Sequence, residues 1–397
     1  MRIGIDARMY GPKQGGLGRY VQQLIEHLNP SSFAAGELRR ASMETWKHEN
    51  TDTEFVVFLR KENWSDFNPT SPKFKKVLAD VPWYGWKEQL LMPGIIKREK
   101  VDLMHFPHWN VPFFYNKPFV VTIHDLILLH YPTRRASTLG PITYWLKNIA
   151  YKAVLRHATT RARAILTPSE FVKTDIINTL KVSAEKITVT YLGITDNMDT
   201  KYLIHNTKYI IPNTKYHITK PYLLYVGVAY PHKNLEGLLN AWNKFCVQHG
   251  HDYQLVLAGK KNYFYQRLIN LPIFQSSNHS IIYTNFVPDA DLPALYQNAA
   301  LYVFPSFYEG FGLPPLEAMQ YSLPVISSNR SCLPEILQDA ALYFDPADQQ
   351  QISDAIWRGL TDNSLRTKLV QAGQKVIHTY SWKNTAKLTW EVYKKMV

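Results

Sequence analysis

Short apolar runs alternate with longer segments of mixed character along the first half of the chain. Runs of this length suit buried parallel strands, and the segments between them carry apolar residues at helical spacing. A helix is predicted over Gly18–Leu28, and strands are predicted over Ile3–Ile5, Phe55–Leu59, Val101–His105, Phe119–Ile123, Ala164–Leu166 and Ile187–Tyr191. This alternation predicts a parallel sheet with helices on both faces. Residues Asn29–Thr53 are polar and irregular, and predict a long loop.

The alternation stops over Thr195–Lys220, which is rich in Asn, Thr, Lys and Tyr, and then resumes. The second set of strands is predicted over Tyr222–Val226, Gln254–Ala258, Ser280–Phe286, Leu301–Phe304 and Pro324–Ser327, with helices over Asn234–His249, Asp291–Asn298 and Pro314–Tyr321. We therefore predict two doubly wound α/β domains, residues 1–195 and 221–379, joined by a linker of residues 196–220. The closing segment, Tyr380–Lys395, has the apolar spacing of an amphipathic helix.

Composition narrows the class of protein. A chain of 397 residues with 46% hydrophobic content is expected to fold as more than one globular domain. We see no apolar run of the ~18–20 residues that a membrane-spanning helix needs. Asp6 interrupts the N-terminal apolar stretch, which argues against a signal peptide. With only two cysteines, Cys246 and Cys332, a reducing cytoplasm is the expected location.

Positive charge is concentrated in the first half, where residues 1–195 hold +10 of the net +13. No acidic residue occurs between Asp125 and Glu170, a window with aromatic and aliphatic residues at helical spacing. Its basic residues are Arg134, Arg135, Lys147, Lys152, Arg156, Arg161 and Arg163. Two interpretations stay open: a helix that docks on an anionic membrane surface, and a solvated helix that packs its apolar side on the core. The net positive charge is the only feature of the sequence that favours nucleic-acid binding, so no nucleic-acid partner is expected.

The candidate chemistry centres on residues 307–319, which read FYEGFGLPPLEAM. Glu309 and Glu317 bracket a glycine turn that follows an apolar strand and leads into a helix near Pro314. Backbone N–H groups at a helix N-terminus bind anions, whereas carboxylates accept hydrogen bonds from hydroxyl groups. A nucleotide sugar carries both kinds of group. The same residues also fit an ordinary turn with a helix dipole stabilised by Glu, so both interpretations stay open at this point.

The stretch resembles the Glu-x7-Glu motif of retaining glycosyltransferases of family 4, which have the GT-B fold. The resemblance implies two Rossmann-like domains that face each other across a cleft, the N-terminal one binding the acceptor and the C-terminal one binding the nucleotide sugar. It also implies that the final helix (about residues 380–397) packs back on the first domain. It also implies donor contacts for Glu309 with the sugar, for Glu317 with the ribose, and for the backbone of Gly310, Phe311, Gly312 and Leu313 with the diphosphate.

Other motifs match the same family in the expected order. The loop GGLGRY resembles the family's N-domain loop beside the donor, which implicates Gly15 and Gly16. The strand-end motif TIHDL resembles the site of a histidine that contacts the donor sugar, which implicates His124 as a catalytic residue, although a structural histidine is the alternative. We expect no metal site, because the histidines near it, His105, His108 and His130, lack the spacing of a ligand set.

Three further segments complete the expected donor site. In YVGVAYPHKN, Lys233 matches a diphosphate-binding lysine, but Val228 stands where the family often has arginine. In AGKKN, Lys260 is the expected second cation, and in NFVPDADLPALY the residues Phe286 and Val287 match the segment against the base. The alternatives are solvent-exposed lysines and a buried strand end. Glu335 is expected to be structural.

The resemblance implies a retaining transfer of a hexose, with mannose from GDP-mannose as first choice, onto a glycan or lipid-linked acceptor in surface polysaccharide synthesis. Glu309, His124 and Lys233 are the expected catalytic residues, and no cofactor or metal is required. The enzyme would be cytoplasmic, with peripheral attachment to the inner face of the cell membrane as an option. The alternatives are a UDP-sugar-dependent transferase, a nucleotide-sugar epimerase of the same fold, and a membrane-associated scaffold without activity.

Overall fold

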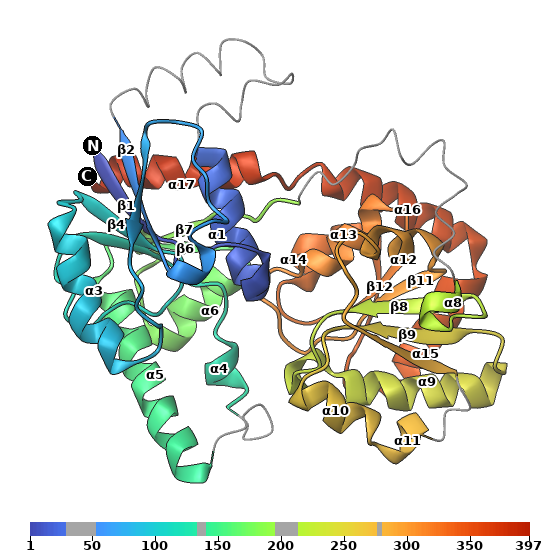
Figure 1. The fold of residues 1–397 in the computed structure, drawn as a ribbon. Coiled ribbons are helices and arrows are strands. Elements are labelled where there is room, and N and C mark those ends of the chain that lie inside the picture. The colour runs from blue at the N-terminus through green and yellow to red at the C-terminus, as the bar shows by residue number, and fades with distance from the viewer. Residues whose placement is uncertain (29–52, 133–139, 195–212, 276–279) are drawn as a thin grey trace, which may run out of the picture. The chain divides into compact units, whose positions relative to one another are not determined.

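The computed structural model describes residues 1–28, 53–132, 140–194, 213–275 and 280–397, which form two compact units (Figure 1). Unit 1 comprises Met1–Leu126, Trp145–Gly193 and Ser381–Val397. Unit 2 comprises Ile127–Tyr144 and Ile194–Tyr380. The loop predicted at Asn29–Thr53 lies, apart from Thr53, outside the described residues, and so does most of the linker predicted at 196–220.

Unit 1 is built on a seven-stranded parallel sheet in the order β3-β2-β1-β4-β5-β6-β7. Its strands are β1 (Arg2–Asp6), β2 (Glu54–Leu59), β3 (Phe74–Leu78), β4 (Leu103–Phe106), β5 (Phe119–Thr122), β6 (Ala164–Thr167) and β7 (Ile187–Val189). Six of them confirm predicted strands, and β3 was missed. Its sequence FKKVL carries two lysines because an edge strand is only half covered.

The helices described in unit 1 are α1 (Gly15–Leu28), α3 (Trp86–Arg98), α5 (Pro141–Arg161), α6 (Glu170–Leu180) and α17 (Trp382–Met396). Residues 127–144, which hold α4 (Ile127–His130) and the start of α5, cluster with unit 2. The predicted glycine loop at Gly15–Tyr20 is wrong in one respect, because these residues already form the first turns of α1. No helix in the described parts of the chain is long and apolar enough to cross a membrane.

The last helix, α17, belongs to unit 1 although the preceding stretch of chain belongs to unit 2. Ser381 caps its start by accepting a hydrogen bond from the Asn384 N–H at 3.2 Å. Its apolar side, which includes Trp390 and Tyr393, is buried, and α17 packs on α1 (Figure 1). Burial of these two large aromatic side chains is the main physical reason for the docking of this helix.

Unit 2 has a six-stranded parallel sheet in the order β10-β9-β8-β11-β12-β13. Its strands are β8 (Tyr222–Val226), β9 (Gln254–Ala258), β10 (Ile281–Asn285), β11 (Leu301–Phe304), β12 (Val325–Ser328) and β13 (Ala341–Phe344). Five confirm predicted strands, and the edge strand β13 was missed. Near-complete burial of β8, β9 and β11 explains why their sequences are almost entirely apolar.

The helices of unit 2 include the three that were predicted, α9 (Leu235–His249), α12 (Leu292–Asn298) and α13 (Leu313–Gln320). The others are α8 (Asn213–Tyr216), α10 (Tyr263–Ile269), α11 (Pro272–Gln275), α14 (Leu333–Leu337), α15 (Gln349–Thr361) and α16 (Asn363–Ile377). Helix α15 packs on α9, and α16 packs on α13.

Both sheets change direction once along their strand order. In unit 1 the first strand, β1, lies between β2 and β4, and in unit 2 the first strand, β8, lies between β9 and β11. In sheets of this kind the connections on the two sides of the first strand diverge at its carboxyl end, which here lies beside β4 in unit 1 and beside β11 in unit 2. Ligands of open parallel sheets bind at these switch points.

Candidate functional site

The sequence motifs of unit 2 gather at the carboxyl edge of its sheet. The segment after β8 carries Lys233, and the segment after β11 carries Glu309. Because β8 and β11 are neighbouring parallel strands, both residues reach the switch point from its two sides. The structure thus brings together two of the three expected catalytic residues.

Lys233 and Glu309 form a largely buried ion pair. The Lys233 Nζ lies 2.6 Å from Oε1 and 2.7 Å from Oε2 of Glu309, whose side chain is 9% exposed. The Glu309 N–H donates to the Ser331 hydroxyl at 3.0 Å, which fixes the backbone of the turn. The ammonium also lies 5.8 Å from the centre of the Phe304 ring. Each partner therefore holds the other in place.

The sequence assigned these two residues to different parts of a ligand, and the pairing refines that assignment. An ammonium has three N–H donors and a carboxylate has about four acceptor sites. The contacts with Glu309 leave Lys233 a further donor, and they leave Glu309 further lone pairs. The pair can therefore bind an anionic group and a hydroxyl group side by side.

The loop that carries Lys233 is held by its own backbone and by a neighbouring segment. Asn234 adopts the left-handed conformation (φ 57°) between the 3-10 turn Pro231–Lys233 and helix α9. Its side-chain amide donates to the Pro346 carbonyl at 2.7 Å, and the Phe307 N–H donates to the His232 carbonyl at 2.8 Å. Burial, reinforced by the charge of Lys233, lowers the pKa of His232 to about 4, so this histidine is neutral.

Glycine is required in the turn before α13. Gly312 has φ +89°, and a Cβ atom there would lie 2.9 Å from the Leu333 side chain. Leu313 is the first residue of α13, with proline in its first turn as predicted. Phe311 is buried with its ring edge-on to Tyr380 at 5.3 Å between centres. The predicted backbone donors, Gly310 to Leu313, therefore lie in a rigid turn that directly follows Glu309.

Glu317 lies in the second turn of α13, not in the first, so the helix dipole does not explain it. The Tyr296 hydroxyl donates to its Oε2 at 3.2 Å. Burial, and then the charge of Glu317, raises the pKa of Tyr296 well above its ordinary value, so Tyr296 remains a donor.

The other donor-site candidates of unit 2 end strands β9 and β10. Gly259 ends β9 so close to β8 that a Cβ atom would lie 2.1 Å from the Gly227 carbonyl oxygen, and the exposed Lys260 follows it. Asn285 is left-handed (φ 64°), and the next residue, Phe286, is 61% exposed. Val287 is only 8% exposed, so Phe286 offers the larger apolar surface for a base.

In unit 1, His124 follows strand β5 and is held on two sides. Its Nε2 donates to the Pro107 carbonyl at 2.9 Å, and the Tyr20 ring packs edge-on at 4.6 Å between centres. Burial lowers the pKa of His124 to about 4, so the neutral ring keeps Nδ1 as an acceptor. Gly15, at the start of α1, has φ +66°, and a side chain at Gly15 or Gly16 would meet open space. By contrast, a Cβ atom at Gly18 would lie 2.0 Å from the Gly11 carbonyl oxygen.

Sequence reasoning missed two buried polar networks in unit 1. In the first, His105 contacts the Tyr393 hydroxyl at 2.6 Å through Nδ1 and the Thr122 hydroxyl at 2.8 Å through Nε2. In the second, Arg8 lies between Asp6 and Glu88. The available signal was a charged pair, Asp6 and Arg8, directly at the end of an apolar strand. Among the described residues no group of His, Cys, Asp or Glu is arranged to hold a metal ion.

Comparison with known proteins now identifies the family. Residues 14–197 match the model for Glycosyltransferase Family 4, and residues 210–376 match Glycosyl transferases group 1. The O-antigen chain mannosyltransferase B of Escherichia coli is 33% identical over 294 residues, which are 74% of each chain. The chain belongs to glycosyltransferase family 4.

This family 4 glycosyltransferase is also 26% identical to the O-antigen chain mannosyltransferase RfbU of Salmonella typhimurium over 284 residues, 70% of each chain. Among solved structures, the sucrose-phosphate synthase of Thermosynechococcus elongatus has a TM-score of 0.72 at 19% identity, covering 100% of this chain and 98% of that one. These findings confirm the predicted GT-B fold and glycosyltransferase activity.

Proposed function

We propose that this glycosyltransferase transfers mannose from GDP-mannose, with retention of anomeric configuration, to a glycan or lipid-linked acceptor in surface polysaccharide synthesis. The names of the relatives, both O-antigen chain mannosyltransferases, support the sugar and the setting. The observation that carries the reaction is the Lys233–Glu309 pair at the switch point of unit 2.

Transfer of a sugar from a diphosphate requires a cation for the leaving diphosphate and an acceptor for the sugar hydroxyls. Lys233 supplies the first and Glu309 supplies the second. The bond between the anomeric carbon and the phosphate oxygen breaks, and the charge left on the diphosphate is stabilised by Lys233, Lys260 and the N–H groups at the start of α13. Glu309 accepts hydrogen bonds from sugar hydroxyls, and Glu317 accepts them from the ribose. These cations lead us to propose that no metal ion is needed, so activity is expected to survive treatment with EDTA.

Retention follows if the acceptor oxygen attacks the anomeric carbon from the side that the diphosphate leaves. The acceptor hydroxyl proton passes to the departing phosphate oxygen, which balances the step without a protein base. Lys233 stabilises that oxygen while charge develops. His124 is neutral and keeps an acceptor nitrogen, which suits a hydrogen bond from a sugar hydroxyl.

A panel of nucleotide sugars tests the proposal directly. The protein is incubated with GDP-mannose, UDP-glucose or UDP-galactose and a mannose-terminated glycan, and both the nucleotide released and the anomer formed are measured. We expect release of GDP and an α-mannoside product. Transfer from a UDP sugar alone would support the UDP-dependent alternative, and an epimerised free nucleotide sugar without transfer would support the epimerase.

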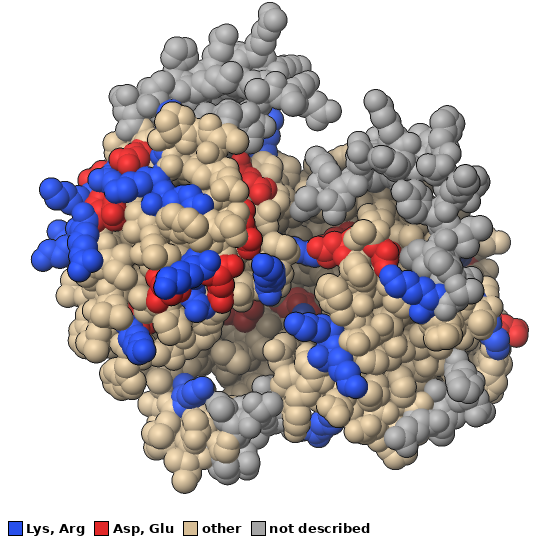
Figure 2. All heavy atoms as spheres, viewed as in Figure 1, with Lys and Arg blue, Asp and Glu red and all other residues tan. Residues whose placement is uncertain are grey.

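We also propose that α5 docks this enzyme on an anionic membrane that displays a lipid-linked acceptor. Ile142, Trp145, Leu146 and Ile149 share one helix face and are 47–75% exposed. Lys147, Lys152 and Arg156 lie on the same helix and are exposed. In Figure 2 the visible surface around the N-terminal end of α5 is tan and blue, without the red that marks Asp and Glu. An apolar face flanked by cations suits an anionic lipid surface.

Vesicle binding separates this proposal from the solvated-helix interpretation. Vesicles that contain anionic lipid are expected to retain the wild-type protein at low salt and to release part of it at high salt. The double substitution Trp145→Ser and Leu146→Ser should abolish retention. The control Val247→Ser removes an 80% exposed apolar residue from α9 and should have no effect. Equal retention of all three proteins would contradict docking through α5.

A further inference from the structure

A small cavity with a mostly apolar wall and a few polar groups lies at the switch point of unit 1. It is lined by residues at and after the ends of β1 and β4, among them Asp6, Arg8, His108 and Asn110, and by Trp83. Its volume is about 20 Å³, room for one water molecule or one hydroxyl group. The position is the unit 1 counterpart of the place that Lys233 and Glu309 occupy in unit 2.

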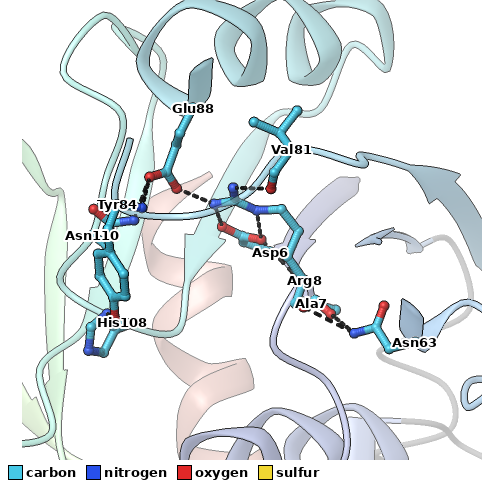
Figure 3. A network of polar contacts seen from close by, with 9 residues as sticks. All are labelled: Asp6, Ala7, Arg8, Asn63, Val81, Tyr84, Glu88, His108 and Asn110. Atoms are coloured by element: carbon cyan, nitrogen blue, oxygen red, sulfur yellow. Dashed lines mark hydrogen bonds and ion pairs between the residues drawn. The ribbon is translucent and has the colours of Figure 1, made fainter. Parts of the chain in front are cut away.

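A buried guanidinium, that of Arg8, is at the centre of a polar network beside this cavity (Figure 3). The Arg8 side chain is 3% exposed and forms a fork with Asp6, with Nε to Oδ1 at 2.8 Å and Nη2 to Oδ2 at 2.7 Å. It also donates to the Val81 carbonyl and to the fully buried Glu88. Bidentate contacts of this kind fix the direction of both groups. Arg8 therefore locks the end of β1 to the start of α3.

Glu88 connects Arg8 to residues beside the cavity. Its second oxygen, Oε2, accepts the Tyr84 N–H at 2.8 Å and the Asn110 side-chain amide at 2.7 Å. Tyr84 is left-handed (φ 62°), a strained conformation for a bulky residue that persists only when neighbours impose it. The strained turn holds the neighbouring Trp83, whose ring also lies under the Arg60 guanidinium at 4.8 Å.

The same contacts leave polar atoms available to the cavity. The side-chain NH2 group of Asn110 donates to Glu88, so the side-chain carbonyl oxygen of Asn110 can accept another hydrogen bond. The Tyr84 hydroxyl lies 3.4 Å from His108 Nδ1, and burial lowers the pKa of His108 to about 3. A neutral histidine and a carbonyl oxygen beside an indole suit a hydroxyl group on a sugar ring, which has polar edges and apolar faces.

We propose that this cavity receives one hydroxyl group of the acceptor sugar, bound by Asn110 and His108, with the sugar ring resting on Trp83. The inference rests on the proposed glycosyl transfer and names a recognition element for its acceptor. Arg8, Asp6 and Glu88 are positioning residues that hold these contacts in place. A cavity of one hydroxyl selects by chemical group rather than by size, because an acceptor that lacks this hydroxyl leaves polar atoms unpaired.

Binding of free glycosides to the full-length protein tests the site without any nucleotide. The probes are methyl α-mannopyranoside and its four monodeoxy derivatives, followed by saturation-transfer NMR. One deoxy position is expected to bind about tenfold or more weakly than the parent. Asn110→Ala and His108→Ala should weaken the parent by a similar factor and remove the discrimination between the derivatives. Trp83→Ala should weaken all the glycosides alike.

Controls separate this site from the donor site and from loss of folding. Trp64→Ala removes a partly exposed tryptophan of unit 1 that does not line the cavity, and should bind like the wild type. GDP binding, measured by calorimetry, should be unchanged in every cavity variant, because the proposed donor site lies in unit 2. Urea unfolding of each variant shows separately that unit 1 is folded. Equal binding of all deoxy derivatives, or full binding by Asn110→Ala and His108→Ala, would overturn the proposal, because the cavity would then hold only water.

Comparing the binding of GDP and GDP-mannose shows whether the cavity receives the acceptor sugar or the donor sugar. If GDP-mannose itself fills the cavity, Asn110→Ala will weaken GDP-mannose more than GDP, and the assignment to the acceptor is overturned. If the wild type binds glycosides through Asn110 but never transfers mannose, the proposed donor fails while the sugar site stands.

Discussion

The two switch points of this glycosyltransferase hold different arrangements of charged side chains. In unit 2 one ammonium meets one carboxylate, Lys233 with Glu309, and the two side chains are 17% and 9% exposed. In unit 1 one guanidinium, Arg8, meets two carboxylates, and the Arg8 and Glu88 side chains are 3% and 0% exposed. The first pair keeps donors and acceptors for a ligand, whereas the contacts of Arg8 go mainly to the protein.

The choice of cation fits this difference. A lysine ammonium is a compact charge with rotatable donors that can turn toward a ligand, whereas the planar fork of arginine fixes the groups around it. We infer that the same topological position serves binding in unit 2 and the support of a binding cavity in unit 1.

Glu309→Gln should lower the rate of mannose transfer by about 100-fold or more, because the amide leaves Lys233 without its counter-charge and misplaces a contact to the transition state. The rate is measured from GDP release with saturating donor and acceptor. Glu236→Gln, in the first turn of α9, is the matched control and should be within about twofold of wild type. If the Glu309→Gln enzyme were as active as the wild type, the Lys233–Glu309 pair would not take part in the reaction.

Arg8→Leu should lower the free energy of unfolding by about 3–5 kcal/mol, because it leaves Asp6 and Glu88 buried without a cation. Burial already raises the pKa of Glu88 above its ordinary value, against the effect of Arg8. Urea unfolding measures the loss. Arg60→Leu, which breaks ion pairs nearer the surface, should cost less than about 1 kcal/mol. Equal costs would show that the triad does not support the fold.

Acid should destabilise unit 1 partly through His105. Burial lowers the pKa of His105 to about 3, below its value of 6.5 in an unfolded chain. The folded state therefore prefers the neutral ring, so this stability is complete above pH 6.5 and is lost as the pH falls from 6.5 toward 3. The slope for one such group is at most about 1.4 kcal/mol per pH unit.

The measurement is urea unfolding at a series of pH values between 7 and 4. His105→Gln should be less stable than wild type at pH 7 but should show a shallower decline in acid. His251→Gln changes an exposed histidine and should follow the wild-type curve. A decline in His105→Gln as steep as in wild type would assign the acid sensitivity to other groups.

Lys260→Ala should raise the KM for GDP-mannose by about tenfold, since an exposed lysine contributes one charge-assisted contact to the diphosphate. Lys261→Ala is the matched neighbour and should change the KM by less than about twofold. The reverse order would move the contact to Lys261, whose backbone N–H is held by Asn285.

Val228→Arg should lower the KM for GDP-mannose by about threefold to fivefold, because it places a cation where the family resemblance leads us to expect one. The Val228 carbonyl accepts the Tyr225 hydroxyl at 2.9 Å, a contact that the substitution leaves in place. Val228→Gln is the uncharged control, and an equal improvement by both variants would exclude a charge effect.

The sequence predicted every central strand of the two sheets, but of the four edge strands it missed β3 and β13. The runs that became β8 and β11 are apolar because both faces are covered, so their pattern is nearly independent of their neighbours. Strand β3 is half exposed and carries Lys75 and Lys76, which hide the strand signal. Glu309, Lys233 and His124 could be predicted as site residues because strand-end motifs are local, whereas Glu88 was missed because its partner Arg8 is 80 residues away.

By itself the sequence determined the α/β class, the two sets of strands, the family and the identity of its strand-end residues, since each depends on neighbours along the chain. Only the tertiary structure decided that Lys233 and Glu309 are paired, that Phe286 is exposed while Val287 is buried, and that Arg8 joins Asp6 to Glu88 beside a cavity. The reason is physical: these properties depend on distances between segments that meet only when parallel strands are ordered around β1 and β8.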